Sequence, residues 1–161
     1  MKKSILVSAC LLGKNCKYNG GNNYNSEIEA LASKYNLIPV CPEQLGGLST
    51  PRLPAEIQQG GGKDVLCGRA KVVRKDGADV SEQFIEGAKE VLNTAKQKNV
   101  KLAILKSKSP SCGKENIYDG TFSGNLIKGN GVTTDILEEN GIKVLTEKDI
   151  QQIKLFLEED E

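Results

Sequence analysis

The chain of 161 residues is 38% hydrophobic and 27% charged, a composition typical of a globular protein and unlike that of a disordered or fibrous chain. Its 22 basic and 21 acidic residues leave a net charge of +1, which argues against binding a nucleic-acid polymer by neutralising phosphates. No apolar run approaches the roughly 18 residues of a membrane span. The N-terminus has no cleavage pattern of a signal peptide, so we expect a cytoplasmic protein that does not contact membranes.

The first half of the chain contains two short apolar runs that predict buried strands. They cover residues 4–8 and 37–40, and the proline in the second favours a strand end. Between them, residues 24–35 have apolar positions at helical spacing, with Asn25 or Ser26 as the N-cap. Residues 41–62 hold three prolines and five glycines, which predicts a long ordered loop of the kind that usually has a function.

The second half of the chain alternates predicted strands with predicted helices. Residues 79–82 (Asp-Val-Ser-Glu) form a capping box, which indicates the start of a helix. Strands are expected over residues 65–73, 100–105 and 142–145, helices over residues 84–95, 132–139 and 150–157, and a polar, glycine-rich segment over residues 106–130. This alternation implies right-handed β-α-β crossovers. We therefore predict an α/β fold, doubly wound, with a mostly parallel sheet, helices on both faces and a single domain over residues 1–161.

Histidine is absent from the chain, whereas cysteine occurs five times, at positions 10, 16, 41, 67 and 112. Without histidine, the chain cannot contain a Ser-His-Asp or Cys-His catalytic pair, or a metal site with an imidazole ligand. An odd number of cysteines without a secretory signal does not indicate a disulfide framework. We therefore expect some of the thiols to bind a metal or to react, although a free cysteine can also be a small core residue.

Three of the cysteines follow predicted strands. Cys10 comes just after the first strand, Cys41 directly after the second, and Cys112 seven residues after Leu105. Ligands of open parallel sheets bind beyond the carboxyl ends of the strands, so these thiols are expected to share one site. Thiolates without imidazole suit an iron–sulfur cluster or zinc. Three ligands on a four-iron cluster would leave one iron open, which favours Lewis-acid or sulfur-accepting chemistry over electron transfer.

The other two cysteines have different expectations. Cys16 could be a fourth ligand, a redox partner of Cys10 or an ordinary loop residue, and the spacing does not distinguish these roles. Cys67 lies within the strand predicted over residues 65–73, and we expect it to be a core residue.

Several polar residues fall in the segments next to these cysteines. Glu43, two residues after the second cysteine of the site, is expected to face the same crevice as a general acid or base, unless it is an ordinary solvated residue. Ser109, three residues before the last cysteine, either hydrogen-bonds a substrate or caps its turn. Arg52 either binds an anionic or carbonyl group or fastens its own loop. Structural roles are favoured for Glu56 and Asp119.

Two glycine-rich segments, residues 60–63 and 129–131, lack the spacing of a phosphate-binding loop. The first is expected to precede a strand, so it would lack the helix N-terminus that binds anions. The second precedes a predicted helix and leaves weak anion-binding capacity at residues 131–133.

A series of short motifs follows in order along the chain, namely Ser8-Ala9-Cys10-Leu11-Leu12-Gly13, Tyr18-Asn19-Gly20, Cys41-Pro42-Glu43, Gly46-Gly47-Leu48, Pro51-Arg52, Ser109-Pro110-Ser111-Cys112-Gly113, Ile117-Tyr118-Asp119-Gly120-Thr121-Phe122 and Gly131-Val132-Thr133. Together they resemble the motifs of a small bacterial family, long labelled a domain of unknown function, that includes the thiouracil desulfidase TudS. The resemblance covers about residues 4–145. Each motif is weak alone, but the ordered set is specific.

The resemblance implies an oxygen-sensitive [4Fe-4S] cluster bound by only three cysteines, which match Cys10, Cys41 and Cys112. It also implies a non-redox desulfuration, in which the open iron takes sulfur from a small thiocarbonyl compound such as 2-thiouracil. Water replaces the sulfur, and the products are the oxo compound and hydrogen sulfide. In this scheme Glu43 matches the proton-transfer group and Ser109 matches the hydroxyl that contacts the substrate.

Two other interpretations remain open from the sequence. The first is a non-catalytic or redox-sensing module, in which Cys16 completes a set of four thiolates around a cluster or zinc. The second is a metal-free sulfur or redox carrier that uses Cys10 and Cys16.

Overall fold

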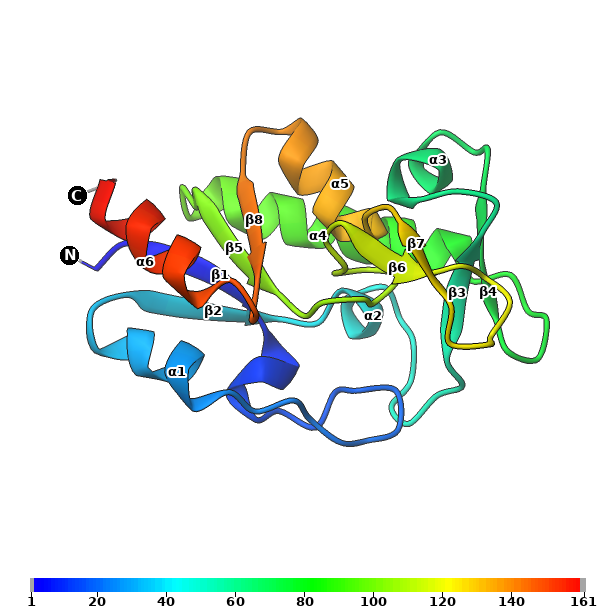
Figure 1. Ribbon diagram of the computed structural model, residues 1–161, viewed down its shortest axis with the longest axis horizontal. Coiled ribbons are helices and arrows are strands. Elements are labelled where there is room, and N and C mark those ends of the chain that lie inside the picture. The colour runs from blue at the N-terminus through cyan, green and yellow to red at the C-terminus, as the bar shows by residue number, and fades with distance from the viewer. Residues whose placement is uncertain (1, 160–161) are drawn as a thin grey trace.

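The computed structural model describes residues 2–159 and contains a four-stranded parallel sheet (Figure 1). Its strands are β1 (Ser4–Ser8), β2 (Asn36–Val40), β5 (Leu102–Leu105) and β8 (Lys143–Thr146), in the spatial order β2-β1-β5-β8. The chain builds the sheet outward from β1 in one direction and then from β5 in the other, which is a doubly wound topology. The direction reverses between β1 and β5, and this switch point is where such sheets bind ligands.

Helices cover both faces of the sheet, so the predicted fold class is confirmed (Figure 1). They are α4 (Ser81–Gln97) and α5 (Val132–Glu139) on one face, and α1 (Ser26–Glu29), a 3-10 turn (Ala30–Ser33) and α6 (Ile150–Glu159) on the other. Leu6 and Leu105 pack towards the first face, whereas Ile5 and Ile104 pack towards the second. Because β1 and β5 are buried on both faces, apolar residues are continuous over residues 5–7 and 102–105.

The segment predicted as a loop over residues 41–62 is more regular than expected. It includes α2 (Pro42–Leu45) and β3 (Ala55–Gln58), and β3 pairs antiparallel with β4 (Lys71–Arg74). Proline suits the first position of α2, because its fixed φ matches a helix and its missing N–H has no helical partner there. Elements of four residues are too short for hydrophobic periodicity to reveal them.

The strand predicted over residues 65–73 is wrong in its first part, because α3 (Gly62–Leu66) extends into this segment. The carboxylate of Asp64 accepts the backbone N–H of Gly61 at 2.9 Å, which stabilises the first turn of α3. Cys67 follows this helix and its side chain is exposed, so the expectation that it is a core residue is also wrong.

The glycines at residues 60–63 therefore begin a helix, contrary to the sequence prediction. The N–H groups of this turn are nevertheless bonded within the protein. Gly62 donates to the carbonyl oxygen of Asn130 at 2.7 Å, and Lys63 donates to the carboxylate of Asp135 at 2.6 Å. These bonds join α3 to the start of α5 instead of leaving donors for an anion.

The polar segment after β5 contains an antiparallel pair of strands, β6 (Asn116–Tyr118) and β7 (Leu126–Lys128). The carboxylate of Glu56, which is buried in β3, accepts the N–H groups of Gly120 (2.9 Å) and Phe122 (3.1 Å) in the connecting loop. Glu56 thus joins two segments that are far apart in the sequence, which is a structural role.

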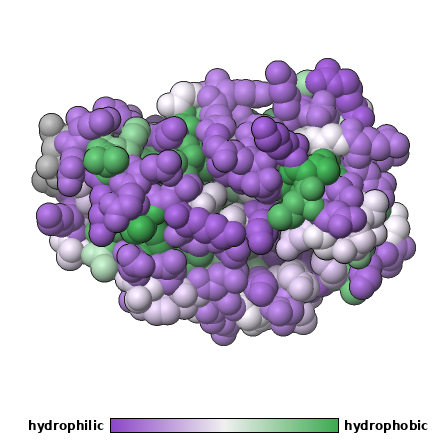
Figure 2. Space-filling view, in the orientation of Figure 1, coloured by the Kyte–Doolittle hydropathy of each residue, from purple (hydrophilic) through white to green (hydrophobic). Residues whose placement is uncertain are grey.

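The surface shown in Figure 2 is mainly hydrophilic, with hydrophobic residues in small separate groups. Within residues 2–159, no helix has the length and apolar character needed to cross a membrane.

Candidate active site

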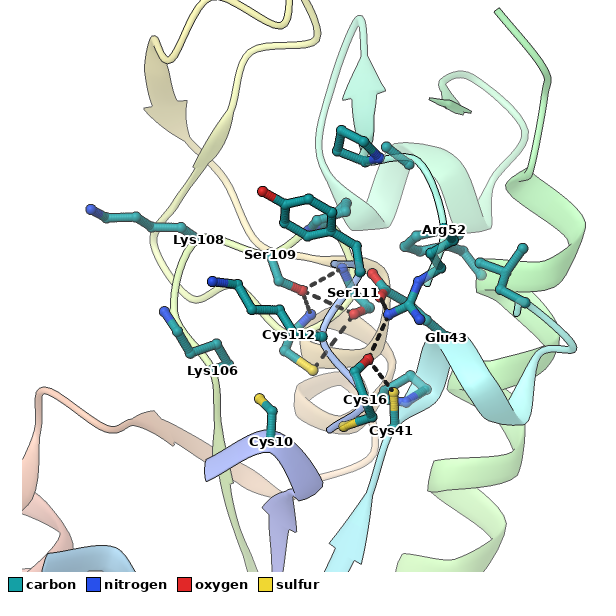
Figure 3. A pocket seen from close by; sticks show the side chains of 18 of the residues that line it. Cys10, Cys16, Cys41, Glu43, Arg52, Lys106, Lys108, Ser109, Ser111 and Cys112 are labelled. Atoms are coloured by element: carbon teal, nitrogen blue, oxygen red, sulfur yellow. Dashed lines mark hydrogen bonds and ion pairs between the residues drawn. The ribbon is translucent and has the colours of Figure 1, made fainter. Parts of the chain in front are cut away.

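A cavity of about 530 Å³ lies beyond the carboxyl ends of β1, β2 and β5, and Cys10, Cys41 and Cys112 line it (Figure 3). Cys10 is in the 3-10 turn Ala9–Leu12 that follows β1, and Cys41 is the N-cap residue of α2, directly after β2. Cys112 comes from the loop after β5. The structure thus brings together the three thiols that the sequence placed at one edge of the sheet, at its switch point.

The loop that carries Cys112 is held by the start of α5. The first two N–H groups of α5 donate to the carbonyl oxygens of Pro110 (2.9 Å) and Ser111 (2.8 Å), and the hydroxyl of Thr134 donates to the carbonyl oxygen of Cys112 (2.8 Å). The predicted anion-binding capacity at residues 131–133 is therefore wrong, because these helix donors position the cysteine loop.

Cys16 also belongs to this group of thiols. Its side chain is buried, lines the cavity and interacts with the thiols of both Cys10 and Cys41. The single S–H of Cys16 can donate to either of these sulfurs, which lowers the pKa of Cys10 and Cys41 to about 7 against the opposing effect of burial and raises the pKa of Cys16. The amide of Asn23 adds a bond to the sulfur of Cys10 at 3.4 Å. Whichever of Cys10 and Cys41 accepts the proton of Cys16 is therefore readily converted to a thiolate, the form that binds metals.

Cys112 is more deeply buried than Cys10 and Cys41. The hydroxyl groups of Ser8 and Ser111 lie 3.5 Å and 3.6 Å from it, and the three side chains are buried. Burial raises the pKa of Cys112 to about 12, although the two hydroxyl groups partly oppose this effect. A negative charge on this sulfur thus needs a compensating positive charge, such as a bound metal.

Glu43 and Arg52 form a partly buried ion pair on the cavity wall (Figure 3). Glu43 is in the first turn of α2. Arg52 also donates to the carbonyl oxygen of Cys16 at 2.9 Å and to the hydroxyl of Thr50 at 2.8 Å. Arg52 therefore fastens its own loop, as one of the two predictions for it stated, whereas the binding of an anionic or carbonyl group of a ligand stays a prediction.

Ser109 lines the cavity and also caps its own turn. Its hydroxyl oxygen accepts the N–H groups of Ser111 (3.1 Å) and Cys112 (2.8 Å). Asp119 lies outside the cavity lining and accepts the N–H and hydroxyl of Thr121 within its own turn.

Sequence reasoning missed a second ion pair beside the cavity. The ammonium group of Lys106, which lines the cavity, lies 3.3 Å from the carboxylate of Glu147, which in turn accepts the N–H (2.8 Å) and hydroxyl (2.7 Å) of Ser107. Burial raises the pKa of Glu147, but the bonds from Ser107 and the charge of Lys106 outweigh it and leave the pKa below its usual value. No local pattern could reveal this pair, because its members come from two different βα connections.

The lowered pKa of Glu147 predicts an acid-sensitive contribution to stability. This contribution is complete above the unfolded-state pKa near 4.5 and disappears as the pH falls through the lower folded-state pKa. We expect Glu147→Gln to lower the free energy of unfolding by about 1–3 kcal/mol at about pH 7 and by much less at about pH 3. Urea unfolding at both pH values measures this difference, and an equal loss at both would contradict the prediction.

The donor set fits a cluster better than a single ion. Across residues 2–159, no group of three cysteine, aspartate or glutamate side chains has the geometry of a site for a single metal ion. In a cubane cluster each thiolate binds a different iron, so the ligating sulfurs surround a larger volume than the ligands of one ion do. Three thiols around a shared cavity, from three separate segments, have this arrangement.

An α/β fold with three thiols around a cavity at its switch point is typical of a protein that binds a metal cluster through thiolates. Comparisons with known proteins identify the family. A family profile described as 2-thiouracil desulfurase matches residues 5–149. The chain therefore belongs to the 2-thiouracil desulfurase family.

Two individual proteins are similar to the chain along nearly its whole length. The uncharacterised protein YbbK of Bacillus subtilis (strain 168) is 48% identical over 149 residues, which are 92% of this chain and 99% of YbbK. The solved structure of the [4Fe-4S]-dependent thiouracil desulfidase TudS is 38% identical, with a TM-score of 0.87 over 98% of this chain and 99% of TudS.

Proposed function

We propose that this protein is a desulfidase that uses a [4Fe-4S] cluster to remove sulfur from a thiolated pyrimidine or a similar small thiocarbonyl compound. With 2-thiouracil, the products are uracil and hydrogen sulfide. The observation that carries this proposal is the meeting of three thiols around one cavity, in a chain whose fold matches TudS along nearly its whole length. The five cysteines are all unpaired, which supports a reducing compartment such as the cytoplasm.

Cys10, Cys41 and Cys112 would hold the cluster. When bound by three thiolates, such a cluster supplies an iron without a protein ligand, which acts as a Lewis acid towards sulfur. The hydrogen bonds on Cys10 and Cys41 and the hydroxyl groups beside Cys112 favour the thiolate form of each ligand.

Glu43 would transfer the protons of the reaction. The net change replaces the thiocarbonyl sulfur with the oxygen of water, so the two protons of that water must leave with the sulfide. The carboxylate of Glu43 faces the cavity, and its ion pair with Arg52 holds it in place. A positioned carboxylate of this kind can accept a proton from water and pass it on.

Ser109 would orient the substrate. Its hydroxyl lines the same cavity as the three thiols, and it lies in the loop that carries Cys112. A polar atom of the pyrimidine could accept the Ser109 proton in place of the Ser111 oxygen, which is 2.9 Å away. The substrate would then be fixed between this hydroxyl and the carboxylate of Glu43.

Iron content and sulfide release test the proposal together. We expect about four irons per chain after anaerobic reconstitution, lost in Cys10→Ala, Cys41→Ala and Cys112→Ala and retained in Cys16→Ala. Cys67→Ala is the matched control, because its thiol is exposed and does not line the cavity. The reconstituted protein should release sulfide from 2-thiouracil.

Two results would support the other interpretations instead. If Cys16→Ala lost iron as completely as the three ligand variants did, four thiolates would close the site, as in a non-catalytic module. If the wild-type chain bound no iron, a thiol redox protein would be favoured.

A further inference from the structure

Two buried hydroxyl groups lie next to Cys112 and take no part in the proton transfer or substrate binding proposed above. Ser8 is 3% exposed and Ser111 is 2% exposed, and their oxygen atoms lie 3.5 Å and 3.6 Å from the sulfur of Cys112. In Figure 3, dashed lines join the hydroxyl of Ser111 to that of Ser109 and to the sulfur of Cys112. Their other hydrogen-bond partners determine whether these hydroxyl groups donate protons to the sulfur or accept one from it.

The proton of Ser111 is directed towards the sulfur. The oxygen of Ser109 accepts two N–H groups, those of Ser111 and Cys112, which uses both of its lone pairs. In the 2.9 Å contact between Ser109 and Ser111, Ser109 must therefore be the donor. The oxygen of Ser111 accepts this proton, and its own proton is left for the sulfur of Cys112.

The hydroxyl proton of Ser8 also points towards the sulfur of Cys112. The oxygen of Ser8 accepts the backbone N–H of Lys106 at 2.9 Å, which orients the hydroxyl group. Within the described part of the chain, the only acceptor found for its proton is the sulfur of Cys112. Two hydroxyl donors thus converge on one buried sulfur. A neutral thiol is a weak acceptor, whereas a metal-bound thiolate is a strong one, so this arrangement suits the charged form.

We propose that Ser8 and Ser111 are positioning residues that donate hydrogen bonds to the metal-bound sulfur of Cys112 and thereby raise the reduction potential of the cluster. This inference rests on the proposed function, because it takes Cys112 as a cluster ligand. Hydrogen bonds to ligand sulfurs withdraw electron density from the iron and stabilise the more negative, reduced state. They also weaken the sulfur as a donor, which leaves the cluster more electrophilic.

The midpoint potential of the reconstituted full chain, measured by a redox titration with electron paramagnetic resonance, tests this role. Ser8→Ala and Ser111→Ala should each bind a full complement of iron and shift the potential to more negative values. We expect each lost bond to change the equilibrium constant for reduction about tenfold, which is about 59 mV for a one-electron couple. The double variant should shift further than either single variant.

Thr133→Val is the matched control. The hydroxyl of Thr133 is fully buried near the same loop, but within residues 2–159 it has no hydrogen-bond partner, so its removal should leave the potential unchanged. Ser8→Thr and Ser8→Val form a second comparison, because they have the same shape and differ only in the hydroxyl. If Ser8→Ala failed to retain iron, retention in Ser8→Thr and loss in Ser8→Val would support the hydroxyl's role.

Two outcomes separate this inference from the proposed function. Unchanged potentials in Ser8→Ala and Ser111→Ala, with iron still dependent on Cys112, would overturn the inference and leave the proposed function intact. Retention of all iron in Cys112→Ala would instead overturn the ligand assignment on which both depend.

Discussion

Glu43→Gln is expected to lower the rate of sulfide release from 2-thiouracil by about 10²–10⁴-fold without loss of iron. Glutamine has nearly the same shape, and its amide oxygen can still accept a hydrogen bond from Arg52, so α2 and its loop should stay in place. A neutral amide cannot accept a proton from water, and the net reaction must move two protons from water to sulfide. The rate constant with 2-thiouracil and the iron content of the same sample test this expectation.

Glu90→Gln is the control for this substitution. Glu90 is exposed on α4 and does not line the cavity, so the rate should equal that of the wild-type protein. A decrease of less than tenfold in Glu43→Gln would contradict the assigned role and show that another group moves the protons.

Gly87→Ala is expected to destabilise the protein and disturb its active site, although alanine normally favours a helix interior over glycine by about 1 kcal/mol. A Cβ atom at Gly87 in α4 would lie 1.9 Å from the carbonyl oxygen of Pro42 in α2. A Cβ atom at Gly46 would approach the carbonyl oxygen of Gln83 equally closely, so the two elements touch through their glycines. An alanine at position 87 must therefore push α2 away from α4.

The displacement matters because Cys41 caps α2 and Glu43 lies within it. We expect the free energy of unfolding to fall by about 1–3 kcal/mol and the rate of sulfide release to fall about 10²-fold. Urea unfolding and the rate assay measure the two effects. Lys89→Ala, on the exposed face of the same helix, should change neither quantity appreciably. Increased stability in Gly87→Ala would contradict the proposed contact.

The longer helices and strands could be predicted from the sequence because local patterns of apolar residues determine them. The edge of the sheet that carries the site then followed from the order of these elements. The buried strands contain continuous apolar runs at residues 5–7 and 102–105, and α4 has an apolar face over several turns. Once strands alternate with helices, the crossover rule makes the sheet parallel. Residues directly after successive strands then meet at one edge, which is why Cys10, Cys41 and Cys112 could be placed together.

The short elements could not be predicted in this way, because contacts distant in sequence hold them. The close packing of Gly46 on α4 positions α2, and the carboxylate of Glu56 ties down the loop between β6 and β7. Neither contact leaves a periodic pattern in a segment of three or four residues. The strand expected around Cys67 was wrong for the same reason, since the bonds between α3 and the start of α5 are invisible in the local sequence.

The same distinction, between local sequence patterns and contacts between distant segments, applies to the site. That three thiols, a carboxylate and a hydroxyl line this cavity could be expected from residue type, position along the chain and the family resemblance. Their mutual orientation could not, because it depends on partners from other segments, such as Arg52 for Glu43 and Ser8 for Cys112. Chain order and backbone topology determine which residues reach the edge of the sheet. Side-chain packing and hydrogen-bond geometry determine which way each proton points once they are there.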